Sequence, residues 1–202
     1  MKLLFATRSA GKQREVRRLL EAAGHEVLFP DDAGVPETIA EEGLEVADSF
    51  EANARAKAEY FARKSGLPTI ADDSGLEVFY LGGQPGVRSR RWAGATGTTV
   101  QVDAANNAEL LRRLRGAPEA KRRAQYRCIL IFLRTPMAVP AVFQGSCAGR
   151  ILEDASGSGG FGYDPYFWCD ALGKSFGDAT IEEKESVSHR GLALAALVAA
   201  LA

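Results

Sequence analysis

Two neighbouring aspartates, Asp72 and Asp73, follow the short apolar stretch Thr69–Ala71, which is typical of a buried strand. Carboxylates at the end of such a strand suit a hard cation such as Mg²⁺, because this ion prefers oxygen ligands. Taken alone, the segment fits a solvated Asx-type turn better. Glu45 and Lys57, taken alone, are typical of a surface glutamate and a solvated lysine on a helix.

A second candidate, the segment Thr7–Lys12, connects a predicted strand to a predicted helix. Backbone N–H groups at a helix N-terminus favour an anion, so Thr7, Ser9, Gly11 and Lys12 could bind phosphate. The segment is no Walker A loop, since that motif needs Gly at position 6 and Ser or Thr at position 13. An ordinary turn with a surface lysine is the plainer interpretation.

The stretch Phe161–Asp164 follows a glycine-rich segment, and its aromatic rings and carboxylate could stack on a nucleobase and accept hydrogen bonds from it. Rings that fill the core explain the pattern equally well. The glycines match G-x-G-x-x-G, but the residues after them are extended and aromatic, which excludes a dinucleotide fold. His189 and Arg190, at a helix start beyond Lys184, could donate to a carbonyl or phosphate.

These candidates suit one kind of ligand, because lysines bind phosphates, acids bind a metal, and aromatic rings with donors bind a base. The elements that must position them alternate between strand and helix patterns. Helices are predicted from position 12 onward, from Ser49 to Lys64 with Asn53 and Lys57 on one face, over Asp103–Leu114, after a capping box at Thr180 and Glu183, and after Ser188–Arg190. Strands are predicted at Lys2–Ala6, His25–Phe29, Thr69–Ala71, Leu76–Leu81, Gln125–Leu133 and Val139–Ile151, the last two as antiparallel neighbours. The acidic segment Pro30–Gly43 lacks periodicity, which indicates a mobile surface loop.

Composition bounds the class of protein. The chain has 202 residues and 21.7 kDa, 46% of them hydrophobic and 25% charged, which predicts one globular domain and excludes disorder as the main state. Its 25 basic and 26 acidic side chains exclude a general affinity for nucleic acid or an anionic membrane. Three cysteines without paired short spacing argue against a disulfide framework. With no apolar run long enough to span a bilayer, we expect a cytoplasmic, unanchored protein.

Six motif blocks, in this order along the whole chain, resemble the noncanonical purine nucleoside triphosphate pyrophosphatases, also called inosine triphosphate pyrophosphatases. The blocks are Thr7-x-Ser9-x-Gly11-Lys12, Ser49-Phe50-x-x-Asn53-Ala54-x-x-Lys57-Ala58, Ala71-Asp-Asp-Ser-Gly-Leu76, Leu81-Gly-Gly-x-Pro-Gly86, Gly159-Gly-Phe-Gly-Tyr-Asp-Pro165, and Glu183-Lys184 with Ser188-His-Arg-Gly191.

The resemblance implies a single pyrophosphatase domain over residues 1–202, with an α/β fold in which helices flank a mixed, elongated and twisted sheet. Two lobes would enclose a central nucleotide-binding cleft, and the protein would be a homodimer. The implied reaction is Mg²⁺-dependent hydrolysis of ITP, dITP and XTP to the monophosphate and pyrophosphate, which cleanses the nucleotide pool. No nucleic-acid or membrane partner is implied.

The resemblance also implies roles for individual residues. Glu45 and Asp73 correspond to the metal-site acids, and Asp73 is also the expected catalytic base. The implied substrate-binding residues are Thr7, Arg8, Ser9, Ala10, Gly11, Lys12, Asn53, Lys57, Ser74, Phe161, Gly162, Tyr163, Asp164, Lys184, His189 and Arg190. Lys12, Lys57 and Lys184 would bind the triphosphate, whereas Phe161–Asp164, His189 and Arg190 would bind the base. The sequence departs from the family pattern at Ser9, where Asn is usual, and at Ala47, where Gly is frequent.

Two other functions stay open. The scaffold could serve a pyrophosphatase for a pyrimidine or another modified nucleotide. Alternatively, the departure at Ser9 is compatible with a nucleotide-binding sensor of weakened catalysis, although the intact Lys12, Asp72, Asp73 and Lys184 argue against it.

Overall fold

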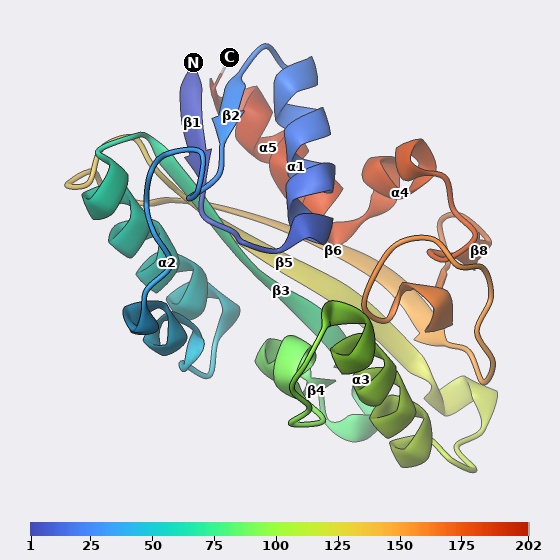
Figure 1. Cartoon of the computed structure of the whole chain (residues 1–202). Coiled ribbons are helices and arrows are strands. Elements are labelled where there is room, and N and C mark those ends of the chain that lie inside the picture. Colours follow the sequence, from blue (N-terminus) through green and yellow to red (C-terminus); the bar gives the residue numbers. More distant parts are fainter. Residues whose placement is uncertain (202) are drawn as a thin grey trace. The chain divides into compact units, whose positions relative to one another are not determined.

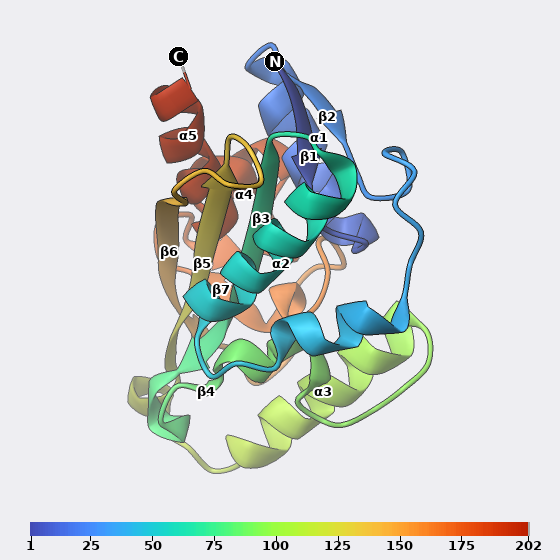
Figure 2. The same cartoon turned by 90° about the vertical axis from the view of Figure 1, so that its left-hand side faces the viewer.

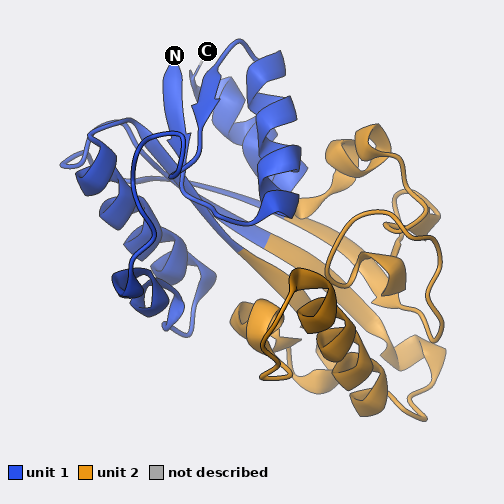
Figure 3. Ribbon diagram, in the orientation of Figure 1, with its two compact units in different colours: residues 1–73, 128–145, 190–202 blue, residues 74–127, 146–189 orange. Residues whose placement is uncertain are grey.

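The computed structural model describes residues 1–201, and its helices and strands form a mixed α/β fold (Figure 1). The chain divides into two compact units, each built from several segments (Figure 3). Unit 1 comprises residues 1–73, residues 128–145 and the chain from Arg190 onward, and unit 2 comprises residues 74–127 and 146–189. The expected mixed sheet with flanking helices is confirmed, whereas the expected cleft stays a prediction.

Unit 1 is built on parallel strands. β1 (Lys2–Phe5) lies between β2 (Glu26–Leu28) and β3 (Thr69–Val78) and is parallel to both, with Leu4 opposite Leu28 and Thr69. β5 (Arg123–Leu133) and then β6 (Ala141–Ile151) follow β3 in the sheet, so the strands at positions 125–133 and 139–151 are neighbours as expected.

Helices lie on both faces of the unit 1 sheet (Figures 1 and 2). α1 (Ala10–Ala22) and α5 (His189–Leu201) pack on one face, where Val16 and Leu197 join a buried cluster with Phe5 and Ile70. α2 (Phe50–Ser65) lies on the other face. As predicted, Ser49 caps α2 by accepting a hydrogen bond from the Ala52 N–H, and the helix ends at Gly66 in the left-handed conformation.

The segment between β2 and α2 differs from the prediction of a mobile loop. It contains the 3-10 helix η1 (Ile39–Glu45), and the Arg8 side chain bonds to Asp31, Glu41 and the Val35 carbonyl within it. The sequence did not predict η1, because the segment lacks apolar periodicity and its polar contacts leave little trace in a hydrophobicity pattern, and the mobility of the segment stays a prediction.

Unit 2 surrounds a second apolar cluster that includes Leu76, Leu110, Tyr126 and Phe167. The sheet continues here with strands antiparallel to their neighbours: β4 (Gln84–Pro85) on β3, β7 (Phe167–Cys169) on β6, and β8 (Lys174–Ser175) on β7. The remaining elements are η2 (Phe79–Leu81), η3 (Gly86–Arg91), α3 (Thr99–Arg113), η4 (Glu119–Lys121), η5 (Asp164–Tyr166) and α4 (Ile181–Val187). The capping box predicted at Thr180 and Glu183 begins α4.

β3 is longer than its sequence pattern predicts. The strand was expected to end at Ala71 and lead into a turn, but it continues without interruption to Val78, so Asp72 and Asp73 lie inside it. The sequence did not predict this continuation of β3, because the polar and glycine residues at 72–75 are typical of a turn. Gly75 is required within the strand, since a Cβ there would lie 2.3 Å from the Gly86 carbonyl oxygen.

Candidate active site

The position of Asp72 and Asp73 inside β3 sends their side chains to opposite faces of the unit 1 sheet, because successive residues of a strand alternate. Asp72 shares a face with Ile70 and bonds to side chains from α1 and α5. Asp73 lies on the other face and bonds to a side chain from α2. Two residues adjacent in sequence therefore have different surroundings and different chemistry.

Asp72 is the centre of a buried ion-pair network. Its carboxylate accepts hydrogen bonds from Lys12 Nζ at 2.9 Å and from two nitrogens of Arg190 at 3.2 Å, and Arg190 also bonds to Glu15. Burial opposes ionisation of this fully enclosed carboxylate, but Lys12, Arg190 and Lys57 outweigh burial and hold its pKa far below the usual range. Asp72 is therefore ionised at any physiological pH.

Asp73 bonds to the side-chain amide of Asn53. Asn53 Nδ2 donates to Asp73 Oδ2 at 2.9 Å, and the Asn53 carbonyl oxygen accepts from the Ala47 N–H, also at 2.9 Å. Burial raises the pKa of Asp73, and the nearby Glu45 charge raises it further, against the opposing effect of Lys57 and Lys12. A buried carboxylate of raised pKa is a better proton acceptor than a solvated one.

Glu45 and Lys57 meet beside these aspartates. Lys57 Nζ donates to a Glu45 carboxylate oxygen and, at 2.5 Å, to the Asp72 backbone carbonyl. Burial lowers the pKa of Lys57, but Glu45, Asp72 and Asp73 outweigh this, so its pKa is raised. Burial likewise opposes the charge on Glu45, whose pKa is nevertheless lowered by Lys57 and Lys12. Lys57 is thus a buried cation on α2, not the solvated charge that its helix position alone suggested.

Glu45 and Asp73 are the carboxylates that could hold a divalent cation. Burial is the main cause of the raised pKa of Asp73 and repulsion by Glu45 adds to it, and a cation between the two carboxylates would relieve that repulsion. Within residues 1–201, no group of three or more His, Cys, Asp or Glu side chains is arranged as a metal site. Two carboxylates nevertheless fit Mg²⁺, because this ion usually takes one or two protein carboxylates and completes its shell with substrate phosphates and water.

The predicted anion-binding loop precedes α1. Thr7 Oγ1 accepts from the Ser9 N–H at 3.2 Å, Ser9 is the N-cap residue, and α1 begins at Ala10 and continues through Gly11 and Lys12. The Ser9 hydroxyl makes no capping hydrogen bond. This geometry leaves the first-turn N–H groups of α1 directed away from the helix body, as an anion site requires.

Arg8 lies in the same loop but points to the acidic segment before α2. Its guanidinium bonds to Glu41 at 2.7 and 2.8 Å, to Asp31 at 2.5 Å and to the Val35 carbonyl at 3.1 Å. The ion pair with Glu41 helps to raise the pKa of Arg8. Arg8 therefore joins the anion-binding loop to the segment that ends with Glu45, and a direct contact with substrate stays a prediction.

Unit 2 contains the residues expected to bind the base. Asp164 is buried, and its Oδ2 accepts from the Phe161 N–H at 2.8 Å and from Lys184 Nζ at 2.6 Å. Lys184 Nζ also lies 4.9 Å from the centre of the Phe161 ring. Tyr163 is buried and donates from its hydroxyl to the Ser89 carbonyl at 2.8 Å. The loop is thus a closed turn organised around the Asp164 carboxylate.

His189 and Arg190 are adjacent in sequence but belong to different units. The His189 ring is buried and stacks on Tyr126, with centroids 4.6 Å apart and planes 8° from parallel. The Arg190 guanidinium bonds to Asp72 and Glu15 in unit 1. Base recognition by either residue stays a prediction. Ser74, the first residue of unit 2, is half-buried in β3.

Sequence reasoning missed three residues that hold predicted site residues in place. Glu15 bonds to Arg190, and Asp103 and Asn107 of α3 bond to the backbone of Gly162. The spacing of Asp103 and Asn107 could have revealed them, since residues four apart lie on the same face of a helix.

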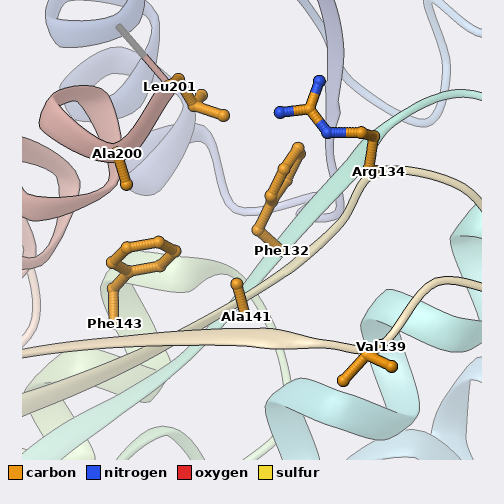
Figure 4. A pocket seen from close by; sticks show the side chains of 7 residues that line it. All are labelled: Phe132, Arg134, Val139, Ala141, Phe143, Ala200 and Leu201. Atoms are coloured by element: carbon orange, nitrogen blue, oxygen red, sulfur yellow. The ribbon is translucent and has the colours of Figure 1, made fainter.

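A cavity of about 210 Å³ lies elsewhere in unit 1, and Figure 4 shows the side chains around it. It is lined by Phe132, Arg134, Val139, Ala141, Phe143, Ala200 and Leu201. None of the predicted site residues contributes to this largely apolar lining, so we assign no part of the nucleotide site to it.

The chain is similar to known proteins along almost its whole length. The sequence matches the model of the Ham1 family over residues 3–200. It is 44% identical to the dITP/XTP pyrophosphatase of Salmonella typhimurium LT2, covering 99% of this chain and 98% of the relative, and 43% identical to that of Methylococcus capsulatus, covering 99% and 96%.

Solved structures are similar as well. A HAM1 protein from Coxiella burnetii matches with a TM-score of 0.85 and 31% identity, covering 100% of this chain and 98% of that one. A nucleoside-triphosphatase / dITP/XTP pyrophosphatase from Mycobacterium abscessus matches with a TM-score of 0.71 and 40% identity, covering 98% of both chains. Within residues 1–201, no helix has the length and apolar character needed to cross a membrane.

Proposed function

The chain belongs to the Ham1 family, and from this we propose that it hydrolyses noncanonical purine nucleoside triphosphates such as ITP, dITP and XTP to the monophosphate and pyrophosphate. The observation that carries the proposal is the group of side chains around β3, where Asp73, Glu45, Lys12 and Lys57 combine two acids with two lysines. Acids that bind a metal, together with lysines that bind phosphates, suit attack on a phosphoanhydride. We assign this activity to the whole of residues 1–202.

Mg²⁺ is the cofactor that we infer, with Glu45 and Asp73 as its protein ligands. When bound, it would neutralise charge on the phosphate oxygens and on the departing pyrophosphate. Lys57, which now donates to Glu45, would then be available to a phosphate oxygen. Lys12 would act beside it, at the N-terminus of α1, where Thr7, Ser9 and the first-turn amides of the helix favour an anion.

Asp73 is the catalytic base of this proposal. It would orient the attacking water and accept its proton at a carboxylate oxygen, and general-base assistance of this kind contributes about 10² to 10⁴-fold to the rate. Two features support the assignment, namely its raised pKa and the amide of Asn53, which fixes one carboxylate oxygen. Asp72 instead holds Lys12 and Arg190 in place, because its charge is already neutralised by them.

We assign binding of the nucleobase to unit 2. The Phe161 ring would stack on the purine, and a donor such as His189 would bond to a 6-oxo group while leaving the 6-amino group of adenine unpaired. A mismatch between buried polar groups can discriminate by about 10⁴-fold, which is the order needed to spare ATP. Lys184, as a cation near this loop, is assigned to the triphosphate.

A homodimer and a cytoplasmic location belong to the same proposal. Both are expectations from the family resemblance. The location is also supported by Cys128, Cys147 and Cys169, which are buried free thiols, as in a reducing compartment. We propose neither nucleic acid nor membrane as a partner, because the chain carries a net charge of −1.

A panel of nucleotides tests the proposed function. ITP, dITP, XTP, GTP and ATP are each incubated with the protein and Mg²⁺, and pyrophosphate and orthophosphate are measured separately. We expect pyrophosphate and monophosphate from the first three, much faster than from ATP or GTP. Asp73→Asn should abolish most turnover and keep the fold, because an amide is a poor base and a poorer metal ligand. Orthophosphate as the primary product would refute the proposal, and so would binding without turnover, which identifies a sensor.

A further inference from the structure

The loop Phe161–Asp164, to which we assign nucleobase binding, forms hydrogen bonds with α3. The Gly162 N–H donates to Asp103 Oδ2 at 2.9 Å, and the Gly162 carbonyl oxygen accepts from Asn107 Nδ2, also at 2.9 Å. Both polar groups of this one residue's backbone are therefore bonded to side chains of the same helix. Asp103 and Asn107 are four residues apart, so they lie one above the other on one face of α3.

Helix α3, which provides these contacts, is itself fixed in place by packing and hydrogen bonds. Its N-terminus is closed by a capping box between Thr98 and Gln101, and Leu110 is fully buried in the unit 2 core. Asn106 fixes the helix to the preceding segment, donating to the Arg90 carbonyl at 3.0 Å and accepting from the Ala93 N–H at 2.9 Å. The position of the Asp103 and Asn107 side chains is thus set by an element with little freedom of its own.

The backbone of the loop, in contrast, can adopt many conformations. Gly160 and Gly162 both adopt positive φ, at 75° and 64°, a region that glycine reaches at no steric cost and leaves as easily. Asp164 fixes the Phe161 N–H from inside the turn. The Asp164 N–H closes the turn by donating to the Phe161 carbonyl at 3.3 Å, but the Gly162 N–H and carbonyl themselves bond to α3.

We propose that Asp103 and Asn107 are positioning residues for base recognition, which hold the Gly162 backbone so that the Phe161 ring is preorganised against the purine. The inference rests on the proposed function, because it assumes that this loop binds the base. Neither residue touches the base in this proposal, and both act through Gly162. A preorganised loop spares the ordering that binding would otherwise require, so the effect falls on affinity and on discrimination between bases.

Steady-state kinetics of four variants test this role. Asn107→Ala removes the donor to the Gly162 carbonyl, and the loss of one hydrogen bond predicts a rise in the KM for ITP of about 2- to 10-fold with little change in kcat. Asp103→Ala removes a charged acceptor and should have a larger effect, about tenfold or more. Asp103→Asn should restore most of the affinity, since an amide oxygen still accepts from Gly162. In the two alanine variants, the preference for ITP over ATP should fall along with affinity.

Arg90→Gln is the matched control. Arg90 is the other partner of Asp103, at 3.2 Å, so the variant breaks that ion pair and leaves the contact with Gly162 intact. We expect its KM for ITP to match the wild type. Folding is followed by thermal unfolding. Asn107→Ala should be well tolerated, because the Asn107 Oδ1 atom is buried with no hydrogen-bond partner in the described part of the chain.

Amide hydrogen exchange at Gly162 provides a readout that is independent of activity. Exchange should be faster in Asp103→Ala than in the wild type and in Arg90→Gln. Unchanged exchange, or an unchanged KM in both alanine variants of an active enzyme, would overturn the inference and leave the proposed function standing. If the wild type hydrolyses no ITP, the proposed function itself fails, and the inference falls with it.

Discussion

Asp72→Asn and Asp73→Asn are identical substitutions at adjacent positions of β3, but only Asp72→Asn should destabilise the fold. In Asp72→Asn, an amide replaces a fully buried carboxylate that bonds to Lys12 and Arg190. The amide oxygen can still accept from one cation, but the amide NH₂ then faces the other, donor against donor. Breaking a buried ion pair on one side costs about 3 to 5 kcal/mol, and we expect a loss of this size.

In Asp73→Asn the balance is different. Burial already disfavours the charge of Asp73, and Glu45 repels it, so its pKa is raised in the folded protein. A neutral amide removes that repulsion, and its oxygen still accepts from Asn53. The free energy of unfolding should therefore stay within about 1 kcal/mol of the wild type or increase.

Ionisation of Asp72 and ionisation of Asp73 also contribute to stability with opposite signs. A carboxyl whose pKa is lowered by folding, such as Asp72, stabilises the fold above its unfolded pKa, and this stabilisation is lost as the pH falls through the folded pKa. A carboxyl of raised pKa, such as Asp73, costs stability when ionised, and this cost disappears as the pH falls through its folded pKa toward its unfolded pKa. Above the folded pKa of Asp73 both effects are fully present, so one pH in that range suffices for the comparison.

Urea unfolding at pH 7 in the presence of EDTA, followed by circular dichroism, measures both variants without a bound metal. Glu51→Gln controls for the removal of a carboxylate, since Glu51 forms an exposed pair with Arg55 on α2 and should contribute less than about 1 kcal/mol. Equal destabilisation in the two aspartate variants would refute the argument from strand faces. A loss below 1 kcal/mol in Asp72→Asn would show that Lys12 and Arg190 do not depend on its charge.

Substitutions at three further positions have expected outcomes. Ser9→Ala should raise the KM for ITP through loss of a hydrogen bond worth about 0.5 to 1.5 kcal/mol, whereas Ser9→Asn should keep or raise activity. The Tm should be unchanged in both variants. An unchanged KM in Ser9→Ala would show that the Ser9 side chain does not contribute to substrate binding. Arg8→Ala should destabilise by about 1 to 3 kcal/mol and expose the segment before α2 to limited proteolysis, and resistance equal to that of the wild type would contradict the role of Arg8. Lys184→Ala should lower the free energy of unfolding by about 3 kcal/mol or more, because it leaves the buried Asp164 charge without this cation, and a Tm equal to that of the wild type would show that the pair is dispensable.

Much of the fold could be predicted because its signals are local. The apolar periodicity of α1, the Ser49 cap, the glycine after Ser65 and the capping box at Thr180 each act within a few residues, and the helices begin and end near them. β5 and β6 were also predicted as neighbours, since long runs of strand-forming residues are joined by a short connection.

The errors arise where distant residues decide the local structure. The sequence at 72–75 is typical of a turn, but β3 pairs with β1 before this stretch and with β4 after it, and the strand stays extended between them. In the same way, Arg8 orders an acidic segment more than twenty residues away. Lys57 looks like a solvated lysine until Glu45 and the Asp72 carbonyl are placed around it. Such polar contacts leave no periodic signal.

The extension of β3 also changes how the paired aspartates are interpreted. In a turn, two adjacent carboxylates would share one environment and could both serve a metal. In a strand, the alternation of side chains places them on opposite faces. Asp72 then bonds to Lys12 and Arg190, whereas Asp73 bonds to Asn53 and lies near the Glu45 charge. In the proposed mechanism, Asp72 is the neutralised acid that holds the cations, and Asp73 is the acid kept basic by burial. This division of roles follows from the secondary structure of four residues, and the different stability changes expected for Asp72→Asn and Asp73→Asn test it directly.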